Sequence, residues 1–144
     1  MVDAYPCRID GHAAQVLVNL ALRLRAPDPE LPWLAYTAVE LLRPDPHGMP
    51  DEDEAEDLTD LQEMLTATFE EHRATFAGAI LTRGRCEFYF YAEEVLKLEE
   101  VIEPVAHEFD EYTFSVGTHE DPVWTHYIGV LIPDGSVVGE DPPN

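Results

Sequence analysis

The chain has 144 residues, enough for one domain with its own hydrophobic core, and apolar residues make up 45% of it. Its 30 Asp and Glu residues against 8 Lys and Arg give a net charge of −22, which disfavours binding to nucleic-acid backbones and to anionic membranes. No apolar run approaches the ~20 residues of a membrane-spanning helix, and the segment before Cys7 lacks the features of a secretory signal, so the cytoplasm is the expected location.

The acidity also has an ordinary explanation, because acidic side chains keep many proteins dispersed in solution. Basic protein surfaces remain the charged partners that such a chain attracts. The two cysteines, Cys7 and Cys86, are far apart in the sequence, and without a CxxC pair a disulfide is not expected. Cys86 lies in an aromatic segment and is predicted to be a small core residue.

The sequence patterns in the N-terminal part of the chain predict strands. The segment from Ala14 to Leu24 alternates apolar and polar residues with the period of a half-buried strand. The turn signal Asp10-Gly11 precedes it, so Tyr5 to Ile9 is expected to pair back as a short strand. Farther on, Trp33 to Leu42 is apolar on both faces, which indicates a central strand.

A first helix is expected from Asp51 to about Arg73. Asp51 and Glu54 fit an N-cap and a capping box, and the acids between them favour the positive end of the helix dipole. An apolar stripe at helical spacing supports the helix and consists of Leu58, Leu61, Leu65 and Phe69. The acid run therefore has a structural explanation beside any functional one.

A hairpin and a second helix are expected next. Phe76 to Thr82 and Arg85 to Tyr91 are predicted strands joined by a tight turn at Arg83-Gly84. Ala92 to Phe109 then shows helical apolar spacing. Pro104 interrupts that pattern because it lacks a backbone N–H, so we expect a kink there or an early end of the helix.

The C-terminal part predicts a strand from Tyr112 to Val116, a turn from Gly117 to Pro122, and a last strand from Val123 to Ile132. Residues 133–144 contain Gly, Pro and acidic residues and are predicted to be a mobile tail. Residues 1–132 are then expected to form a single domain.

The order of these elements predicts an α+β fold with a mainly antiparallel sheet of about six strands and two helices on one face. The elements from the Trp33 strand to the Tyr112 strand follow the order βαββαβ, which is that of a ferredoxin-like split βαβ core. The first and last strands are expected to extend this sheet.

Several short segments together resemble a known family. They are Asp10-Gly11, Val18-Asn19, Pro32-Trp33-Leu34, Gly48-Met49-Pro50, the hairpin from Thr82 to Tyr91, and Asp121-Pro122-Val123-Trp124 followed by Tyr127. They resemble the bacterial proteins of the domain of unknown function 695, over residues 5 to 132. That family has no established activity, so the resemblance implies no catalytic residues. Some of its members distantly resemble the regulator of ribonuclease activity B, an acidic ferredoxin-like protein that inhibits an RNA-degrading enzyme by binding it.

Two groups of residues are candidates for contact with a partner protein. The acidic start of the first helix would steer association, and it consists of Asp51, Glu52, Asp53 and Glu54. One face of the sheet is expected to carry a group of aromatic residues that either pack in the core or form a patch that would supply contact area, and the group consists of Tyr89, Tyr91, Trp124 and Tyr127.

Arg83 and Arg85 are the candidate ligand-binding residues. They flank Gly84 at a hairpin tip, where paired arginines are able to grip a carboxylate or a phosphate. The favoured interpretation is nevertheless ion pairing with local acids such as Glu87.

No metal site, cofactor or catalytic residue is expected from the motifs. His119, Glu120, Asp121 and His126 lie close in the sequence, but their spacing matches no standard zinc pattern. The chain also lacks a Gly-rich phosphate loop and a Gly-x-Ser-x-Gly elbow.

The leading interpretation is therefore a non-enzymatic binding or regulatory module whose partner is a basic protein, such as a nucleic-acid enzyme. Direct binding to nucleic acid or to a membrane is not expected. Two alternatives stay open: an enzyme that takes a small ligand in a cleft formed by Arg83, Arg85 and tyrosines, and a structural domain that self-associates as a homodimer.

Overall fold

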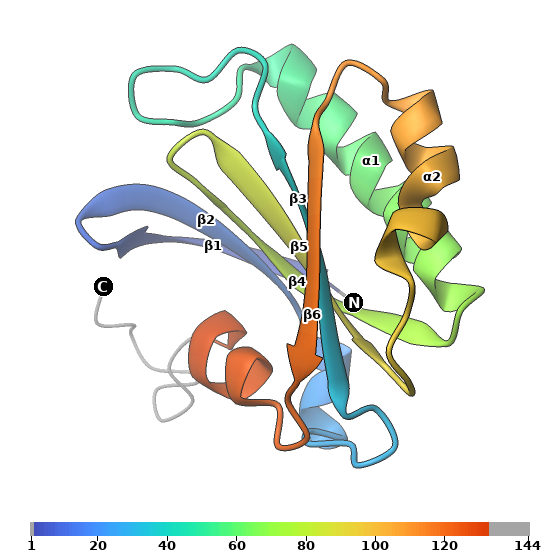
Figure 1. Ribbon diagram of the computed structural model, residues 1–144. Coiled ribbons are helices and arrows are strands. Elements are labelled where there is room, and N and C mark those ends of the chain that lie inside the picture. Colours follow the sequence, from blue (N-terminus) through green and yellow to red (C-terminus); the bar gives the residue numbers. More distant parts are fainter. Residues whose placement is uncertain (1, 133–144) are drawn as a thin grey trace.

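The computed structural model describes residues 2–132 and contains one six-stranded sheet in the order β1-β2-β4-β5-β3-β6, in which every neighbouring pair is antiparallel (Figure 1). The strands are β1 Val2–Ile9, β2 His12–Asn19, β3 Trp33–Glu40, β4 Ala74–Thr82, β5 Arg85–Ala92 and β6 Phe114–Glu120. The predicted α+β class is confirmed.

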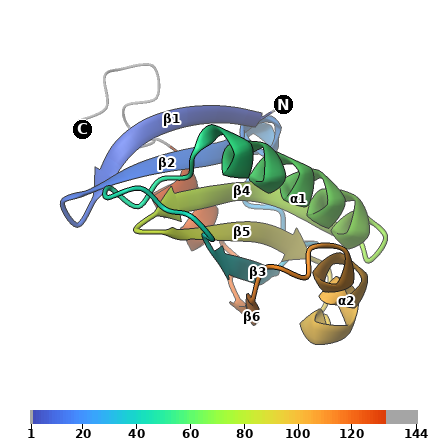
Figure 2. The same cartoon turned by 90° about the horizontal axis from the view of Figure 1, so that it is seen from above.

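Four adjacent strands, β4-β5-β3-β6, have the ferredoxin-like arrangement that the sequence predicted. The helix α1, Glu52–Glu70, connects β3 to β4, and α2, Leu98–Glu108, connects β5 to β6. Since β5 lies between β3 and β4 and is antiparallel to both, β3 and β4 run parallel as a split βαβ unit. The hairpin of β1 and β2 extends the sheet beyond β4, and both helices cover one face (Figure 2).

The core between helices and sheet follows from the apolar stripe of α1. Leu61, Leu65 and Phe69 are fully buried, and the Phe69 ring stacks on Phe90 of β5 with ring centroids 3.9 Å apart. Val105 of α2 is also fully buried. The predicted helical period therefore places the core side chains correctly.

The predicted last strand, Val123 to Ile132, is wrong. After a turn that begins at Asp121, this segment forms a short helical stretch, η2, Tyr127–Leu131, which packs on the face of the sheet opposite α1 and α2 (Figure 1). Trp124, Tyr127 and Leu131 are fully buried there. Their spacing of three and four residues is that of a helix face, and this signal was present in the sequence.

Several element boundaries also differ from the predictions. β2 ends at Asn19, whose side-chain oxygen accepts the N–H of Ala21 and starts a 3-10 turn, η1, over Leu20–Leu24. β6 continues through the predicted turn to Glu120, where it pairs with β3.

The helices are shorter than predicted at one end. α1 ends at Glu70, and α2 begins only at Leu98. Pro104 lies inside α2, which runs on to Glu108, so of the two effects expected of this proline the early end is wrong, and the kink stays a prediction. No helix in residues 2–132 is long and apolar enough to cross a membrane. The predicted tail, residues 133–144, lies outside the described residues.

Candidate functional site

The outer surface of α1 and α2 is acidic, and we call it the acidic layer. Its exposed carboxylates on α1 are Glu52, Asp53, Glu56, Asp60, Glu63 and Glu70, and those on α2 are Glu99, Glu100, Glu103 and Glu108. Within residues 2–132, none of them forms an ion pair. The helices lie side by side on the sheet, so their charges reinforce one another (Figure 2).

The start of α1 divides the predicted acidic contact residues into two kinds. Asp51 is the N-cap, and its side-chain oxygen accepts the backbone N–H of Glu54 at 2.7 Å. This hydrogen bond, together with the Arg43 guanidinium, holds the pKa of Asp51 below its usual range. Asp51, Glu52 and Asp53 are exposed and remain predicted partner contacts.

Glu54 is fully buried, so its predicted role in partner contact needs correction. Its carboxylate accepts the N–H of Leu42 at 2.6 Å and the N–H of Arg43 at 2.9 Å, in the segment that follows β3. It also accepts the hydroxyl of Tyr112 at 2.7 Å. The capping box is thus only half formed, because this carboxylate ties α1 to β3 and to the segment before β6.

The predicted aromatic patch is a core and does not lie on the surface. Tyr91, Trp124 and Tyr127 are fully buried, and Tyr89 is 5% exposed. Tyr91 stacks on Trp124 with ring centroids 4.2 Å apart, and the indole N–H of Trp124 donates to the carbonyl of Leu31. These side chains hold the C-terminal segment on the sheet, which explains their burial.

Asp121 organises the turn that precedes η2. Its carboxylate accepts hydrogen bonds from the N–H groups of Thr125 and His126 and from the Tyr91 hydroxyl. Burial alone would raise the pKa of Asp121, but these hydrogen bonds outweigh it and lower that pKa. The Tyr91 hydroxyl is thus held between Asp121 and the N–H of Tyr127, to which it acts as acceptor.

The cluster of histidines and acids does not converge on one point. His119 and Glu120 are exposed on β6, whereas Asp121 is buried. The His126 ring packs on Tyr89 with centroids 4.1 Å apart, and burial lowers the pKa of His126. In the part of the chain that the structure describes, no group of at least three His, Cys, Asp or Glu residues is placed to hold a metal ion.

Arg85 is ion-paired, as the favoured interpretation predicted. Its guanidinium lies 2.8 Å from the Glu87 carboxylate and 3.0 Å from that of Glu40. A cleft of about 450 Å³ adjoins these groups and also reaches Arg83 and Thr82. The tyrosines expected in this cleft do not line it, and two carboxylates already neutralise Arg85.

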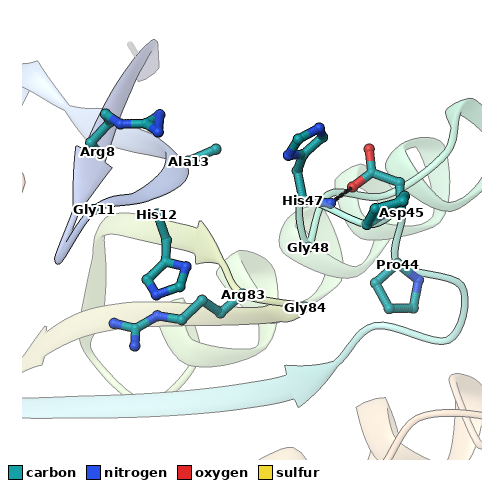
Figure 3. Close-up of a pocket in the computed structure, with 11 residues that line it drawn as sticks. Arg8, Gly11, His12, Ala13, Pro44, Asp45, His47, Gly48, Arg83 and Gly84 are labelled. Atoms are coloured by element: carbon teal, nitrogen blue, oxygen red, sulfur yellow. Dashed lines mark hydrogen bonds between the residues drawn. The ribbon is translucent and has the colours of Figure 1, made fainter.

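A second cavity lies at the same end of the sheet, and we call it the hairpin-end pocket. It measures about 440 Å³ and is lined by Arg8, Gly11, His12, Ala13, Pro44, Asp45, Pro46, His47, Gly48, Arg83 and Gly84 (Figure 3). Three segments far apart in the sequence form it: the β1–β2 hairpin, the loop between β3 and α1, and the β4–β5 turn.

Glycines bring these segments together. A Cβ at Gly48 would lie 2.7 Å from both the Cα of Arg83 and the N of Gly84, so only glycine permits the approach. The N–H of Gly84 donates to the carbonyl of Gly48 at 2.9 Å. The guanidinium of Arg83 meets the Asp10 carboxylate at 3.1 Å, which connects the two hairpin turns.

Sequence reasoning identified the turns but missed this pocket. Asp10-Gly11 and Arg83-Gly84 were both recognised as turns, and their positive φ angles fit two-residue hairpin loops. Arg8, His12 and His47 gave no signal of their own. Only the pairing of β2 with β4 places the two hairpins together, and sequence spacing does not reveal that pairing.

Comparison with known proteins identifies the family. Neither the curated proteins nor the solved structures yielded a match. The sequence profile described as "Family of unknown function (DUF695)" matches residues 3–132. This range includes every described strand and helix except Val2, the first residue of β1, and the chain therefore belongs to that family.

Proposed function

We propose that this protein is a non-enzymatic binding module that docks onto a basic surface of another protein through its acidic layer. The observation that supports the proposal is the set of exposed carboxylates on α1 and α2, which have no ion-pair partners within residues 2–132. The cytoplasm remains the proposed location.

The charges of the acidic layer favour such a partner energetically. Like charges on neighbouring helices repel one another, and a basic surface relieves that repulsion while it attracts the module over a Debye length of about 8 Å at physiological salt. The chain's net charge of −22 acts in the same direction. Electrostatic attraction of this kind raises the association rate and weakens as salt is added.

The predicted aromatic contact area has to be removed from this proposal because those side chains are buried. The acidic layer instead presents the carboxylates and the aliphatic stems of glutamates. We therefore expect an interaction that depends strongly on ionic strength. The resemblance to the regulator of ribonuclease activity B suggests a nucleic-acid enzyme as partner, and this part of the proposal rests on that resemblance alone.

The experiment compares two variants with equal loss of charge. Glu52, Glu56 and Asp60 are spaced four residues apart and form one line on α1, and all are exposed. The test variant is Glu52→Gln/Glu56→Gln/Asp60→Asn. The control variant is Asp3→Asn/Glu30→Gln/Glu120→Gln, which removes three exposed carboxylates outside the helices.

Each immobilised protein is incubated with cell extract at low and high salt, and captured proteins are quantified by mass spectrometry. The proposal predicts that the wild type and the control variant enrich the same basic proteins at low salt, and that the helix variant loses them. Equal loss in both variants would show a nonspecific charge effect. Failure of the wild type to enrich any basic protein would refute docking.

The small-ligand enzyme receives less support, because Arg85 is neutralised by Glu40 and Glu87 and the tyrosines are buried. Self-association remains a competing outcome. Light scattering at high protein concentration distinguishes it, since a homodimer doubles the measured mass and a docking module without a partner stays monomeric.

A further inference from the structure

The hairpin-end pocket gathers cationic side chains on a protein with few of them. The chain has 8 Lys and Arg residues against 30 acids, yet Arg8 and Arg83 both line this pocket with two histidines, His12 and His47. Figure 3 shows Arg8 and His12 on the side of the β1–β2 hairpin, His47 on the opposite wall, and Arg83 along the lower side. Cationic side chains are thus more concentrated around this pocket than in the rest of the chain.

The acid in the lining of the pocket is bound to the backbone of its own loop and not to an arginine. Asp45 is the acid that lines the pocket, and its carboxylate accepts the N–H groups of His47 at 2.7 Å and Met49 at 2.9 Å. These bonds close the loop between β3 and α1 and lower the pKa of Asp45. Arg8 has no ion pair with any residue from 2 to 132, so its guanidinium is available to an external anion.

Arg83 is only loosely neutralised. Its side chain is 48% exposed and pairs through one nitrogen with Asp10, which is 78% exposed. Exposed pairs of this kind contribute little stability, and an arginine offers five N–H donors, so Arg83 retains donors for a ligand. The backbone around it is fixed, since its turn bonds to the loop at Gly48.

The arrangement of donors favours a phosphate group. Residues with guanidinium and imidazole N–H groups line the pocket from three separate segments, and a tetrahedral phosphate has oxygens pointing in several directions to accept such donors. A planar carboxylate offers two oxygens in one plane and satisfies fewer donors. The volume of about 440 Å³ lies within the range of small-molecule sites.

We propose that the hairpin-end pocket binds the phosphate group of a small molecule, held by Arg8, Arg83 and the two imidazoles. The ligand is small, because the acidic surface beyond the pocket repels a nucleic-acid polyanion. This inference does not depend on the acidic layer: the two surfaces lie on different elements, and each can fail its own test without affecting the other.

The test is a titration of the protein with inorganic phosphate or phenyl phosphate, monitored by the NMR shifts of backbone amides. Acetate is the comparison anion, and the ionic strength is kept constant. The expected result is saturable shifts around Gly11, Gly48 and Gly84 with at least one phosphate probe. Binding of inorganic phosphate alone identifies free phosphate as the ligand chemistry, and binding of phenyl phosphate identifies a phosphomonoester.

Two variants each remove one of the pocket arginines, and a third variant serves as a control. Arg8→Gln removes the guanidinium that has no ion pair within residues 2–132. Arg83→Asn removes the other guanidinium and creates Asn-Gly, the residue pair that two-residue hairpin turns favour. The control Arg23→Gln removes an exposed charge on η1. Each pocket variant should raise the phosphate dissociation constant about tenfold or more, and the control should change it less than about twofold.

Thermal unfolding checks that Arg83→Asn is folded, which the turn geometry leads us to expect. Three results would each overturn the proposal. They are shifts that do not saturate or are spread over the whole molecule, acetate binding as tightly as phosphate, and equal weakening by Arg23→Gln, which would indicate general charge attraction.

Discussion

Replacing Glu54 with alanine tests how much one buried carboxylate contributes to this fold. The side chain is fully buried and accepts hydrogen bonds from the N–H groups of Leu42 and Arg43 and from the Tyr112 hydroxyl. Alanine leaves these three donors without an acceptor. They belong to the segment after β3 and to the segment before β6, so the loss loosens the contact of α1 with both.

The magnitude follows from the number of donors. An unsatisfied buried donor costs about 1–3 kcal/mol, and hydrogen bonds to a charged acceptor lie toward the upper part of that range. The two backbone donors are only partly buried, so water can reach them after the substitution. We therefore expect Glu54→Ala to lower the free energy of unfolding by about 4 kcal/mol, a large share of the 5–15 kcal/mol typical of a domain.

Urea unfolding followed by tryptophan fluorescence measures the effect. With a slope of about 2 kcal/mol per M, the midpoint should fall by about 2 M. The midpoint of Glu54→Gln should fall less, because glutamine keeps the shape of the side chain and one acceptor oxygen. Glu56→Ala is the matched control: it removes an exposed glutamate two residues along the same helix and should change stability by less than about 0.5 kcal/mol. A loss below about 1 kcal/mol for Glu54→Ala would refute the reasoning.

Two further predictions concern Gly48 and His126. Gly48→Ala should destabilise the protein by about 2–3 kcal/mol, because the added Cβ would meet backbone atoms at 2.7 Å. Gly11 has a similar φ but nothing within 4 Å of an added Cβ, so Gly11→Ala should cost only about 1 kcal/mol. Thermal unfolding of both variants measures the difference. Equal losses for both glycines would contradict the contact. Burial lowers the pKa of His126 from 6.5, so the unfolded chain binds that proton at higher pH than the folded protein, and stability falls as the pH drops below about 6.5. His126→Phe keeps a ring against Tyr89 and removes a buried nitrogen, Nε2, that lacks a partner among the described residues. The melting temperature of this variant should therefore depend less on pH between 7.5 and 5.5 than that of the wild type. Parallel pH profiles for the two proteins would exclude this role of His126.

Local signals predicted the sheet and the first helix. The turn pairs Asp10-Gly11 and Arg83-Gly84 lie where β1–β2 and β4–β5 turn, and the Asp51 N-cap sets the start of α1. The βαββαβ order then allowed few topologies, which is why the ferredoxin-like core was predictable.

The segment after Asp121 was misread for a physical reason. Trp124, Tyr127 and Leu131 fit a helix face, but the interposed Val123, Ile128 and Val130 also made the segment apolar enough for a strand. A short apolar run does not distinguish a buried helix from a buried strand. The burial of the aromatic side chains follows from this segment, so of the two interpretations for them core packing agrees with the structure and a contact surface does not.

The candidate site was predictable only in part, because its residues meet through tertiary contacts. Glu54 carries the sequence signature of a capping box, yet its carboxylate is bonded to Tyr112, far along the chain. Likewise, Arg8 and His47 come together only after β2 pairs with β4 and the Gly48 loop packs on the β4–β5 turn.

The C-terminal segment, residues 121–132, affects how the chain can fold while it is being synthesised. Its hydrogen bonds reach back to the first strands: the Tyr5 hydroxyl donates to the carbonyl of Leu131, and the Tyr127 hydroxyl donates to the carbonyl of Asn19. Until residues 121–132 leave the ribosome, the sheet face that carries Tyr89 and Tyr91 lacks the cover of Trp124, Tyr127 and Leu131. The nascent polypeptide therefore exposes these aromatic side chains from the synthesis of Tyr91 until that of Ile132, the interval in which chaperone contact would be of most value.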